Sequence, residues 1–301
     1  MNHDILFGAN INPAVDELAE SLQIAALAET HGLDLIGIQD HPYQKRFFDT
    51  WTLMSYLAAR TERVHLLTNV ANLPLRLPSM LAKAAASLDV LTGGRVELGL
   101  GAGAFWQAIE AWGVPARSPK EAYTGFEDAL HILKGMWANP GRPFTYQGDM
   151  YSVKGVLAGP APAHPIRVWV GGYGPKMLRL TGRMGDGLIV SNTYTPVSEL
   201  PAFNARIDEG AEEMGRSPDA IRRGYNVMGI LNYGQHSSVP TGLGEGAFFG
   251  TVKDWADYLN GLHQEQRLDT FVFWGVGNDM IRQLEVFARE VVPLVKASVK
   301  A

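Results

Sequence analysis

Short apolar runs alternate with segments of helical periodicity along almost the whole chain. Apolar runs rich in β-branched residues are typical of strands buried in a parallel sheet. The predicted strands are Ile5–Ala9, Leu35–Gln39, Val64–Val70, Val96–Leu100, Ile166–Val170, Leu188–Ser191, Gly224–Leu231 and Phe271–Trp274. The predicted helices between them are Ala14–Thr30, Thr50–Arg60, Pro78–Leu91, Pro119–Ala138, Pro175–Met184, Val197–Met214, Val252–Leu262 and Asn278–Val295. This strict alternation predicts the α/β class and a (β/α)8 TIM barrel, with residues 1–301 forming a single domain.

Three segments between these elements are longer than ordinary connections. Asn139–Pro165 contains a predicted hairpin, with FTYQ and MYSVK on either side of Gly148-Asp149. Ser191–Pro196 and Asn232–Gly250 each follow a strand, so they are predicted to lie at the C-terminal face, where barrel enzymes place their chemistry. The polar, glycine-rich stretch 232–250 has two interpretations, a mobile lid or a tolerated insertion.

Composition narrows the class of protein. The chain is 46% hydrophobic and 19% charged, with a net charge of −5, so it has no basic footprint for nucleic acid. No apolar run approaches the roughly 20 residues that span a membrane, and MNHDILFGANI lacks the features of a signal peptide, which favours a cytoplasmic protein. There is no cysteine, and the eight histidines show no HExxH or HxH spacing. We therefore expect no metal site.

Two glycine-rich turns follow predicted strands and are candidate ligand sites. The first, Gly99-Leu-Gly-Ala-Gly-Ala104, formally matches the GxGxxG/A dinucleotide fingerprint. It follows the fourth strand rather than the first, so we reject a Rossmann interpretation. The second, Gly171-Gly-Tyr-Gly174, leads into a helix that starts at Pro175. Backbone N–H groups at such a helix start favour a phosphate, whereas an ordinary tight turn is the alternative.

Asp40-His41 ends the second predicted strand, on the face where a barrel binds its substrate. A carboxylate and an imidazole there can bind a ligand and move protons, although a loop histidine facing water is the plainer explanation. Aromatic residues also gather near strand ends, where they favour a flat aromatic cofactor and an apolar substrate. The aromatic residues predicted to line the substrate pocket are Tyr43, Phe105, Trp106 and Trp274.

Taken together, these segments resemble the bacterial luciferase-like flavin-dependent oxidoreductases, which are barrels that bind FMN or its deazaflavin relative, coenzyme F-420. The resemblance covers nearly the whole chain. It is strongest at TNVANLPLRLPSMLAKAAASLDVLTGGRVELGLGAG (68–103) and continues at PIRVWVGGYGPKMLRLTGRMGDGLIVS (165–191). GTVKDWADYLNGL (250–262) is similar to a helix start of the family.

The resemblance implies roles for individual residues. Asn69-Val70 matches a site that often has a cis peptide bond behind the flavin ring. Gly101, Ala102 and Gly103 would line the ring and the ribityl chain. The backbone of Gly171, Gly172 and Tyr173 would meet the phosphate. Asp40 would help to bind the cofactor, and His41 would lie beside the reactive ring carbon as the catalytic residue.

The same resemblance leaves two reactions open. One is hydride transfer with coenzyme F-420, and the other is oxygenation by reduced FMN, as in a monooxygenase. The Asp40-His41 pair is similar to the deazaflavin branch, which tips the prediction slightly toward F-420. The sugar-phosphate dehydrogenases of that branch carry characteristic residues just after the glycine-rich strand end and just after the histidine. This chain has Ala104-Phe105 and Lys45 in those two places, so it does not match them there. Asn72 and Phe105-Trp106 suggest a drier pocket than a sugar needs.

Several partners and alternatives follow. The expected partners are a small-molecule substrate, a separate flavin reductase or F-420-reducing enzyme, and a second copy of the chain in a homodimer. No membrane partner is expected. One alternative is a non-catalytic flavin-binding protein of the same fold. Another is a cofactor-free lyase or hydrolase that uses Lys83 or an acidic pair as its base.

Overall fold

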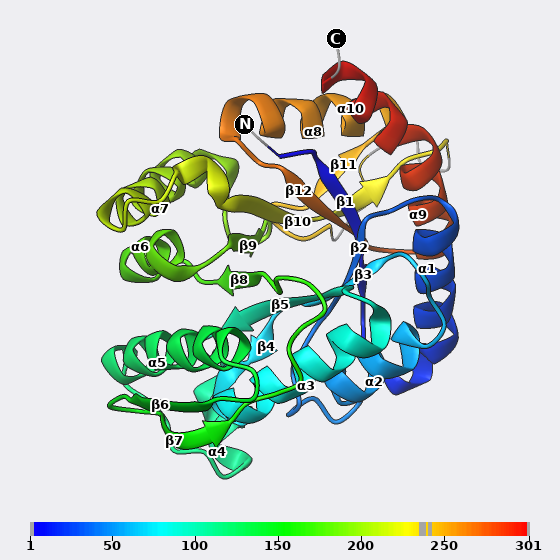
Figure 1. Cartoon of the computed structure of the whole chain (residues 1–301). Helices are drawn as coiled ribbons and strands as arrows, with labels where there is room; N and C mark the ends of the chain where they lie inside the picture. The colour runs from blue at the N-terminus through cyan, green and yellow to red at the C-terminus, as the bar shows by residue number, and fades with distance from the viewer. Residues whose placement is uncertain (1–2, 235–238, 240–242, 300–301) are drawn as a thin grey trace.

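Eight parallel strands close into a barrel in the computed structural model, which describes residues 3–234, 239 and 243–299. The last barrel strand pairs with the first, with Gly8 opposite Val272, and this pairing closes the ring (Figure 1). The strands, in order around the barrel, are β1 (Leu6–Ile11), β2 (Leu35–Ile38), β3 (His65–Thr68), β5 (Val96–Gly101), β8 (Val168–Gly171), β9 (Gly187–Ser191), β10 (Arg222–Leu231) and β12 (Thr270–Gly275). The predicted TIM barrel is confirmed.

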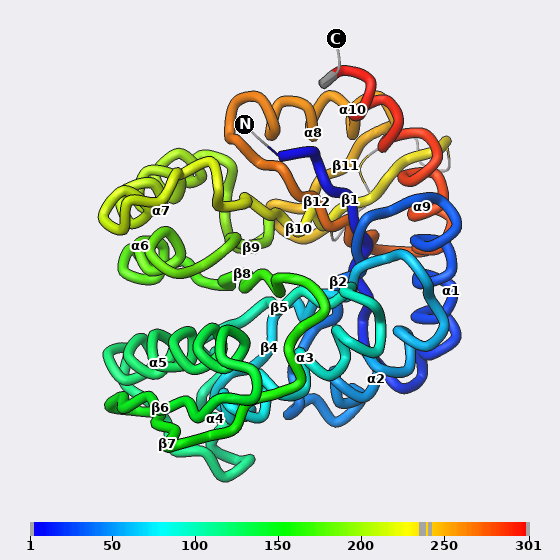
Figure 2. Tube along the Cα trace, in the orientation of Figure 1, coloured from blue at the N-terminus to red at the C-terminus, as the bar shows by residue number. Residues whose placement is uncertain are grey.

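The helices lie outside this ring and cover it, as the backbone trace in Figure 2 shows. Their bounds are α1 (Leu18–Thr30), α2 (Thr50–Ala58), α3 (Pro78–Thr92), α5 (Pro119–Ala138), α6 (Pro175–Met184), α7 (Leu200–Glu213), α8 (Val252–Gln266), α9 (Met280–Val286) and α10 (Val292–Val299). Two helix starts carry a capping box, Ser118 with Glu121 on α5 and Thr251 with Asp254 on α8.

The structure corrects some predicted bounds. The helix predicted over Ala14–Thr30 begins at Leu18, after a 3-10 turn over Val15–Glu17. The helix predicted over Asn278–Val295 is divided into α9 and α10 by a π-helical stretch, Phe287–Val291. A short helix, α4 (Trp106–Ala111), was not predicted, because it is only six residues long and follows a glycine-rich turn.

The predicted hairpin exists, but its turn is longer than two residues. Strands β6 (Pro143–Gln147) and β7 (Ser152–Leu157) pair antiparallel, with Gln147 opposite Ser152. The buried carboxylate of Asp128 on α5 explains the difference, since it accepts hydrogen bonds from the backbone N–H groups of Met150 and Tyr151. The turn therefore wraps around a side chain of α5 and takes four residues.

The segment 232–250 is only partly described. Its end forms β11 (Phe248–Gly250), which pairs with β10. Residues 235–238 and 240–242 lie outside the described residues, so the lid over this segment stays a prediction. Among the described residues, no helix is both long enough and apolar enough to cross a membrane.

The barrel interior is layered along its axis. Inward side chains at mid-height form an apolar plug, because alternate residues of each strand face the axis. The plug consists of Leu35, Leu67, Trp169, Ile189 and Val272, with Leu6 and Val70 packed against it. Trp169 fits because Gly187 and Gly224 face it, where an added Cβ would lie 2.5 Å and 3.2 Å from its ring. A solid centre leaves the two ends of the barrel as places for chemistry.

Candidate active site at the carboxyl ends of the strands

Glycines of β5 and β8 leave a shallow cradle at the C-terminal end of the barrel. The side chain of Val70 lies between them, since a Cβ added at Gly101 or Gly171 would come within 2.9 Å and 2.8 Å of its Cγ2 atom. The peptide bond between Asn69 and Val70 is cis, as the resemblance implied. The hydroxyl of Thr68 donates a hydrogen bond of 2.7 Å to the carbonyl of Gly99 and ties the two strands together. Glycine at positions 101 and 171 therefore lets Val70 pack directly against the backbone of both strands, and neither position adds a side chain of its own to the mouth.

A layer of polar side chains lies above the apolar plug. Asn69 Nδ2 donates to Asn226 Oδ1 at 2.7 Å, and Asn226 Nδ2 donates to the hydroxyl of Ser191 at 3.0 Å. Asn10 on β1 joins the same group, with its Oδ1 3.5 Å from Asn69 Nδ2. The Nδ2 atom of Asn10 and the Oδ1 atom of Asn72 are buried and have no hydrogen-bond partner among the described residues. Buried amides normally find partners, so these two atoms indicate a polar ligand at this level.

Asp40 is engaged by the protein on both of its carboxylate oxygens. Arg76 forms a two-pronged ion pair with it, with both N···O distances 2.6 Å, and the backbone N–H of Asn72 donates to Oδ2 at 2.8 Å. Arg76 also bonds to Asp49 at 2.7 Å. Burial opposes the charge on Arg76, but its bonds to Asp40 and Asp49 outweigh burial and raise its pKa. Asp40 is thus placed to fix the backbone before His41, and its direct contact with a cofactor stays a prediction.

His41 lies in an aromatic corner of the mouth. Its Nδ1 atom is 2.7 Å from the hydroxyl of Tyr43, and Phe105 packs edge-on against it with ring centres 6.2 Å apart. Burial lowers the pKa of His41 and outweighs the opposite effect of Asp40. Burial, and secondarily Asp40, raise the pKa of Tyr43 to about 12. At neutral pH the pair therefore consists of a neutral imidazole and a protonated phenol.

The remaining residues predicted to contact the cofactor or the substrate lie on two opposite sides of the mouth. Trp106 lies against Gly103, where an added Cβ would be 3.1 Å from its ring, and half-exposed Ala102 separates Gly103 from the cradle. Across the barrel, Trp274 on β12 lines a small cavity of about 30 Å³ together with Asn10. Phe105 is brought beside His41 and Tyr43, whereas Trp274 lies on the far side of the mouth.

The second glycine turn leads into α6 as predicted. Gly172 packs against Met177, where an added Cβ would be 2.5 Å from Cγ, and Tyr173 is about half exposed. Gly174 at the start of α6 provides no side-chain cap, so the first N–H groups of this helix have no capping side chain among the residues that the structure describes.

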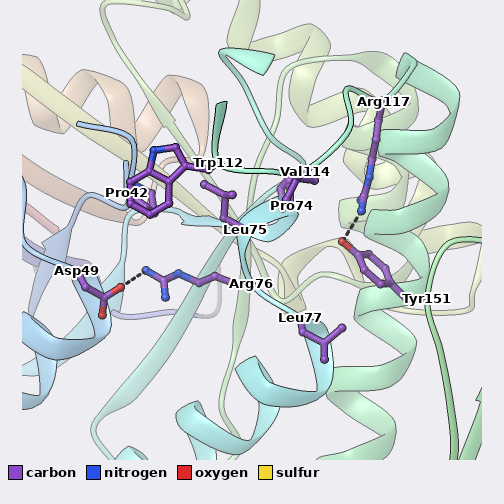
Figure 3. A pocket seen from close by; sticks show the side chains of 10 residues that line it. All are labelled: Pro42, Asp49, Pro74, Leu75, Arg76, Leu77, Trp112, Val114, Arg117 and Tyr151. Carbon is purple, nitrogen blue, oxygen red and sulfur yellow. Dashed lines mark hydrogen bonds and ion pairs between the residues drawn. The ribbon is translucent and has the colours of Figure 1, made fainter. Parts of the chain in front are cut away.

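A larger groove of about 480 Å³ lies next to the mouth (Figure 3). Arg76 and Asp49 form its floor on one side, and Arg117, bonded to the hydroxyl of Tyr151 at 2.8 Å, closes the other. Its lining residues are Pro42, Asp49, Pro74, Leu75, Arg76, Leu77, Trp112, Val114, Arg117 and Tyr151. Pro42, the residue after His41, therefore borders an open, partly apolar groove.

Comparison with known proteins places this geometry in a family. The family model described as luciferase-like monooxygenase matches residues 5–234. The F-420-dependent glucose-6-phosphate dehydrogenase of Intrasporangium calvum is 30% identical over 250 residues, which cover 80% of this chain and 73% of that protein. Matches to three further relatives of that name cover 61–62% of their lengths.

The chain belongs to the luciferase-like monooxygenase family. This confirms the predicted family and the predicted class of oxidoreductase. Solved structures agree in fold. An F-420-dependent secondary alcohol dehydrogenase, solved with an F-420–acetone adduct, has a TM-score of 0.83 at 17% identity, over 97% of this chain and 99% of that one. The oxygenating constituent of 3,6-diketocamphane monooxygenase of Pseudomonas putida, in complex with FMN, has a TM-score of 0.76 at 17% identity, with the same coverage.

For this luciferase-like barrel, sequence reasoning missed the residues that support the site from a distance. Arg76 lies 36 positions from Asp40, and Asn226 lies 157 positions from Asn69. A signal for Asn10 and Asn226 existed, because both are amides within otherwise apolar strands. Lys83, the base of one alternative, donates a hydrogen bond to the carbonyl of Gly159 on the outer surface, which removes it from the mouth.

Proposed function

We propose that this protein is a coenzyme F-420-dependent oxidoreductase that moves a hydride to or from a small, apolar, carbonyl- or hydroxyl-bearing substrate. The observation that carries the proposal is the corner of His41, Tyr43 and Phe105 beside the glycine cradle. In this corner the imidazole of His41 could accept a proton, and Phe105 provides an apolar contact. The glycine cradle next to it would leave room for a flat ring. The 30% sequence identity with an F-420-dependent relative supports the choice of F-420 as the cofactor.

The residues of the mouth fit such a cofactor. Val70, Gly101, Ala102 and Gly103 would hold the ring, since a Cβ at Gly101 would meet Val70 and no larger side chain is accommodated there. The unpartnered amide atoms of Asn10 and Asn72, together with Asn69, would provide hydrogen bonds to the polar edge of the ring. These are the groups expected around a buried heteroaromatic ligand.

The phosphate would be held by the second glycine turn. Gly171, Gly172 and Tyr173 lead into α6, whose first N–H groups have no side-chain cap. A helix start of this kind carries a partial positive charge and suits an anion. When bound, the cofactor would supply the hydride-accepting carbon.

His41 would hold or accept the proton of the substrate oxygen. If its Nδ1 proton is donated to Tyr43 Oη at 2.7 Å, Nε2 is free to accept a proton from a substrate hydroxyl. The lowered pKa of His41 keeps this nitrogen unprotonated at neutral pH. Asp40 and Arg76 would act by holding the loop, and Phe105, 64% exposed, would offer an apolar contact to the substrate.

The aromatic corner favours an apolar substrate over a sugar phosphate. Ala104 and Phe105 follow the glycine cradle, at a position where the resemblance marks a difference from the sugar-phosphate dehydrogenases, and Lys45 is exposed. Trp106 and Trp112 extend the apolar surface toward the open groove. Secondary alcohols, ketones and aldehydes are therefore the classes to assay first.

Turnover under two atmospheres tests the proposal. Without oxygen, oxidised F-420 should be reduced in the presence of a substrate from an alcohol panel, and reduced F-420 should be oxidised by the matching carbonyl compound. Oxygen consumption with reduced FMN, but no reaction with F-420, would make the protein a monooxygenase and overturn the proposal. Binding of cofactor without turnover in either assay would favour the non-catalytic alternative.

The predicted partners extend this proposal. A separate F-420-reducing enzyme would regenerate the cofactor. We further propose that a second copy of the chain covers the apolar side chains exposed on α2 and α3, which include Tyr56, Met80 and Leu91, the last 83% exposed. Sedimentation equilibrium tests this directly. A dimer that dissociates when Leu91 is changed to Lys supports it, and a monomer at all concentrations contradicts it.

A further inference from the structure

Two histidines and a glutamate meet at the other end of the barrel, away from the carboxyl ends of the strands. His65 begins β3, Glu97 is the second residue of β5, and His164 lies in the connection that leads to β8. The three strands are neighbours in the barrel (Figure 1). One ligand atom from each side chain lies within 4.8 Å of the other two. No residue of the proposed active site takes part.

Glu97 directs one carboxylate oxygen at the two histidines. It is 4% exposed, and its Oε2 atom accepts hydrogen bonds from the backbone N–H of Arg167 at 3.2 Å and from Trp169 Nε1 at 3.3 Å. Its Oε1 atom lies 3.9 Å from His65 Nδ1 and 3.7 Å from His164 Nε2. Both gaps exceed ordinary hydrogen-bond length, so the three atoms lie close together without bonding directly to one another.

His164 is already oriented as a metal-binding histidine is. Its Nδ1 atom lies 2.8 Å from Asp89 Oδ1, and its backbone N–H donates to Asp89 Oδ2 at 3.0 Å. Asp89 is completely buried. Nε2 is buried, has no hydrogen-bond partner within the described part of the chain, and lies 3.7 Å from Glu97 Oε1. A carboxylate behind one ring nitrogen, with the other nitrogen free, is the usual arrangement behind a metal ligand.

We propose that His65, Glu97 and His164 bind a divalent transition-metal ion, with Zn²⁺ as the best match. Two imidazoles and a carboxylate are ligands that Zn²⁺ takes, and water would complete the tetrahedron. Ligand atoms around tetrahedral Zn²⁺ lie about 3.3 Å apart. The two distances from Glu97, 3.7 Å and 3.9 Å, require contraction by a few tenths of an ångström, and the two imidazole nitrogens lie within 4.8 Å of each other. Sequence spacing carries no trace of this site, because three distant segments contribute one ligand each.

Arg167 is the competing cation. Its Nη1 atom lies 3.1 Å from Glu97 Oε1, the oxygen that the metal would use. The side chain is 45% exposed, so it can turn into solvent when an ion binds. The bound ion would join β3, β5 and the connection before β8. It would therefore stabilise the end of the barrel at which the strands begin. It would take no part in hydride transfer.

Isothermal titration of the untagged, chelator-treated chain with Zn²⁺ tests the proposal. We expect one Zn²⁺ per chain and a rise in melting temperature on binding, since a ligand that binds only the folded state stabilises it. His65→Ala and His164→Ala should each weaken binding at least tenfold. Arg167→Gln should strengthen it, because the competing charge is removed. His131→Ala, an exposed histidine on α5, is the matched control and should bind as the unaltered chain does.

Two results would overturn the metal site. One is the absence of stoichiometric Zn²⁺ binding to the unaltered chain. The other is unchanged affinity in both His65→Ala and His164→Ala, which would place the ion elsewhere. If His164→Ala fails to fold, the half-exposed His65 and Arg167 variants decide the matter, since opposite shifts in affinity are expected from them.

Discussion

The imidazole of His41 is the residue on which the proposed chemistry depends. Two effects act on the pKa of this imidazole. Burial disfavours its charged form and lowers the pKa, whereas the neighbouring Asp40 favours the charged form and raises it. Burial prevails, so the ring is neutral when the protein works near neutral pH. Tyr43 then fixes the ring through its hydroxyl group without supplying a charge of its own.

Replacing His41 with Ala should slow turnover about 10²–10³-fold while leaving cofactor affinity nearly unchanged, because a positioned acid–base group contributes to the transition state rather than to binding. Steady-state kinetics and a cofactor titration on the same preparation measure both quantities. His131→Ala serves as the control. Equal turnover in His41→Ala and the unaltered protein would remove His41 from the mechanism.

The pH dependence follows from the direction of the same pKa shift. With the pKa lowered from the ordinary 6.5, His41 remains a proton acceptor further into the acid range than a free histidine does. The rate of alcohol oxidation should therefore fall with decreasing pH and reach half of its maximum only below pH 6.5. A pH–rate profile checks this. An inflection at or above pH 6.5 would contradict the assigned role.

At the scale of elements, the turn after β5 brings the cradle and the aromatic corner together. Gly103 has φ +103°, and an added Cβ would lie 2.7 Å from Pro74. Gly141, in the connection after α5, also has a positive φ, +71°, but has no atom within 4 Å of an added Cβ. Substitution at Gly141 would introduce backbone strain alone, whereas substitution at Gly103 would introduce strain and also a contact inside the site.

Gly103→Ala should reduce stability by about 1–2 kcal/mol and also weaken cofactor binding, because the strain and the clash both act on the cradle. Gly141→Ala should reduce stability by a similar or smaller amount and leave binding intact. Chemical unfolding and cofactor titration of both variants provide the comparison. Equal binding by the two variants would show that the turn does not shape the site.

The link between the loop after β2 and the turn after β4 (Ala71–Asn72) depends on the pairing of Asp40 and Arg76. Arg76→Met should lower the free energy of unfolding by about 3 kcal/mol, since a buried carboxylate loses its partner. Adding Asp40→Asn should restore part of that loss, because the uncompensated charge is removed. A double-mutant cycle in denaturant measures the coupling. Additive losses would mean that the ion pair does not act as a unit.

Elements were predictable where a local pattern determines them. The bounds of α5 and α6 agree with prediction at both ends, because Pro119, Pro175 and the Ser118 capping box mark their starts. The turn of the β6–β7 hairpin was mispredicted because Asp128, a residue of a distant helix, determines its length. Local sequence has no information about such a contact.

At the scale of the whole molecule, the order of apolar runs was sufficient to predict a closed barrel. The predicted pair Asp40-His41 and the predicted aromatic Phe105 come together, since strand ends of a barrel meet at one face. The amide layer of Asn10, Asn69 and Asn226 was not predicted, because its members contact one another only when β1, β3 and β10 are arranged around one axis. The sequence thus indicated that the site lies at the C-terminal face of the barrel. Which side chains meet there depends on how the strands are arranged when the barrel closes.

Cofactor choice is the central claim, and a parallel anaerobic titration tests it most directly. The purified chain is titrated with coenzyme F-420, FMN and reduced FMN, and binding is followed by fluorescence. Binding of F-420 should be tight and saturable, and it should be weakened in Gly103→Ala but not in Gly141→Ala. Preferential binding of reduced FMN, or binding of none of the three, would contradict it.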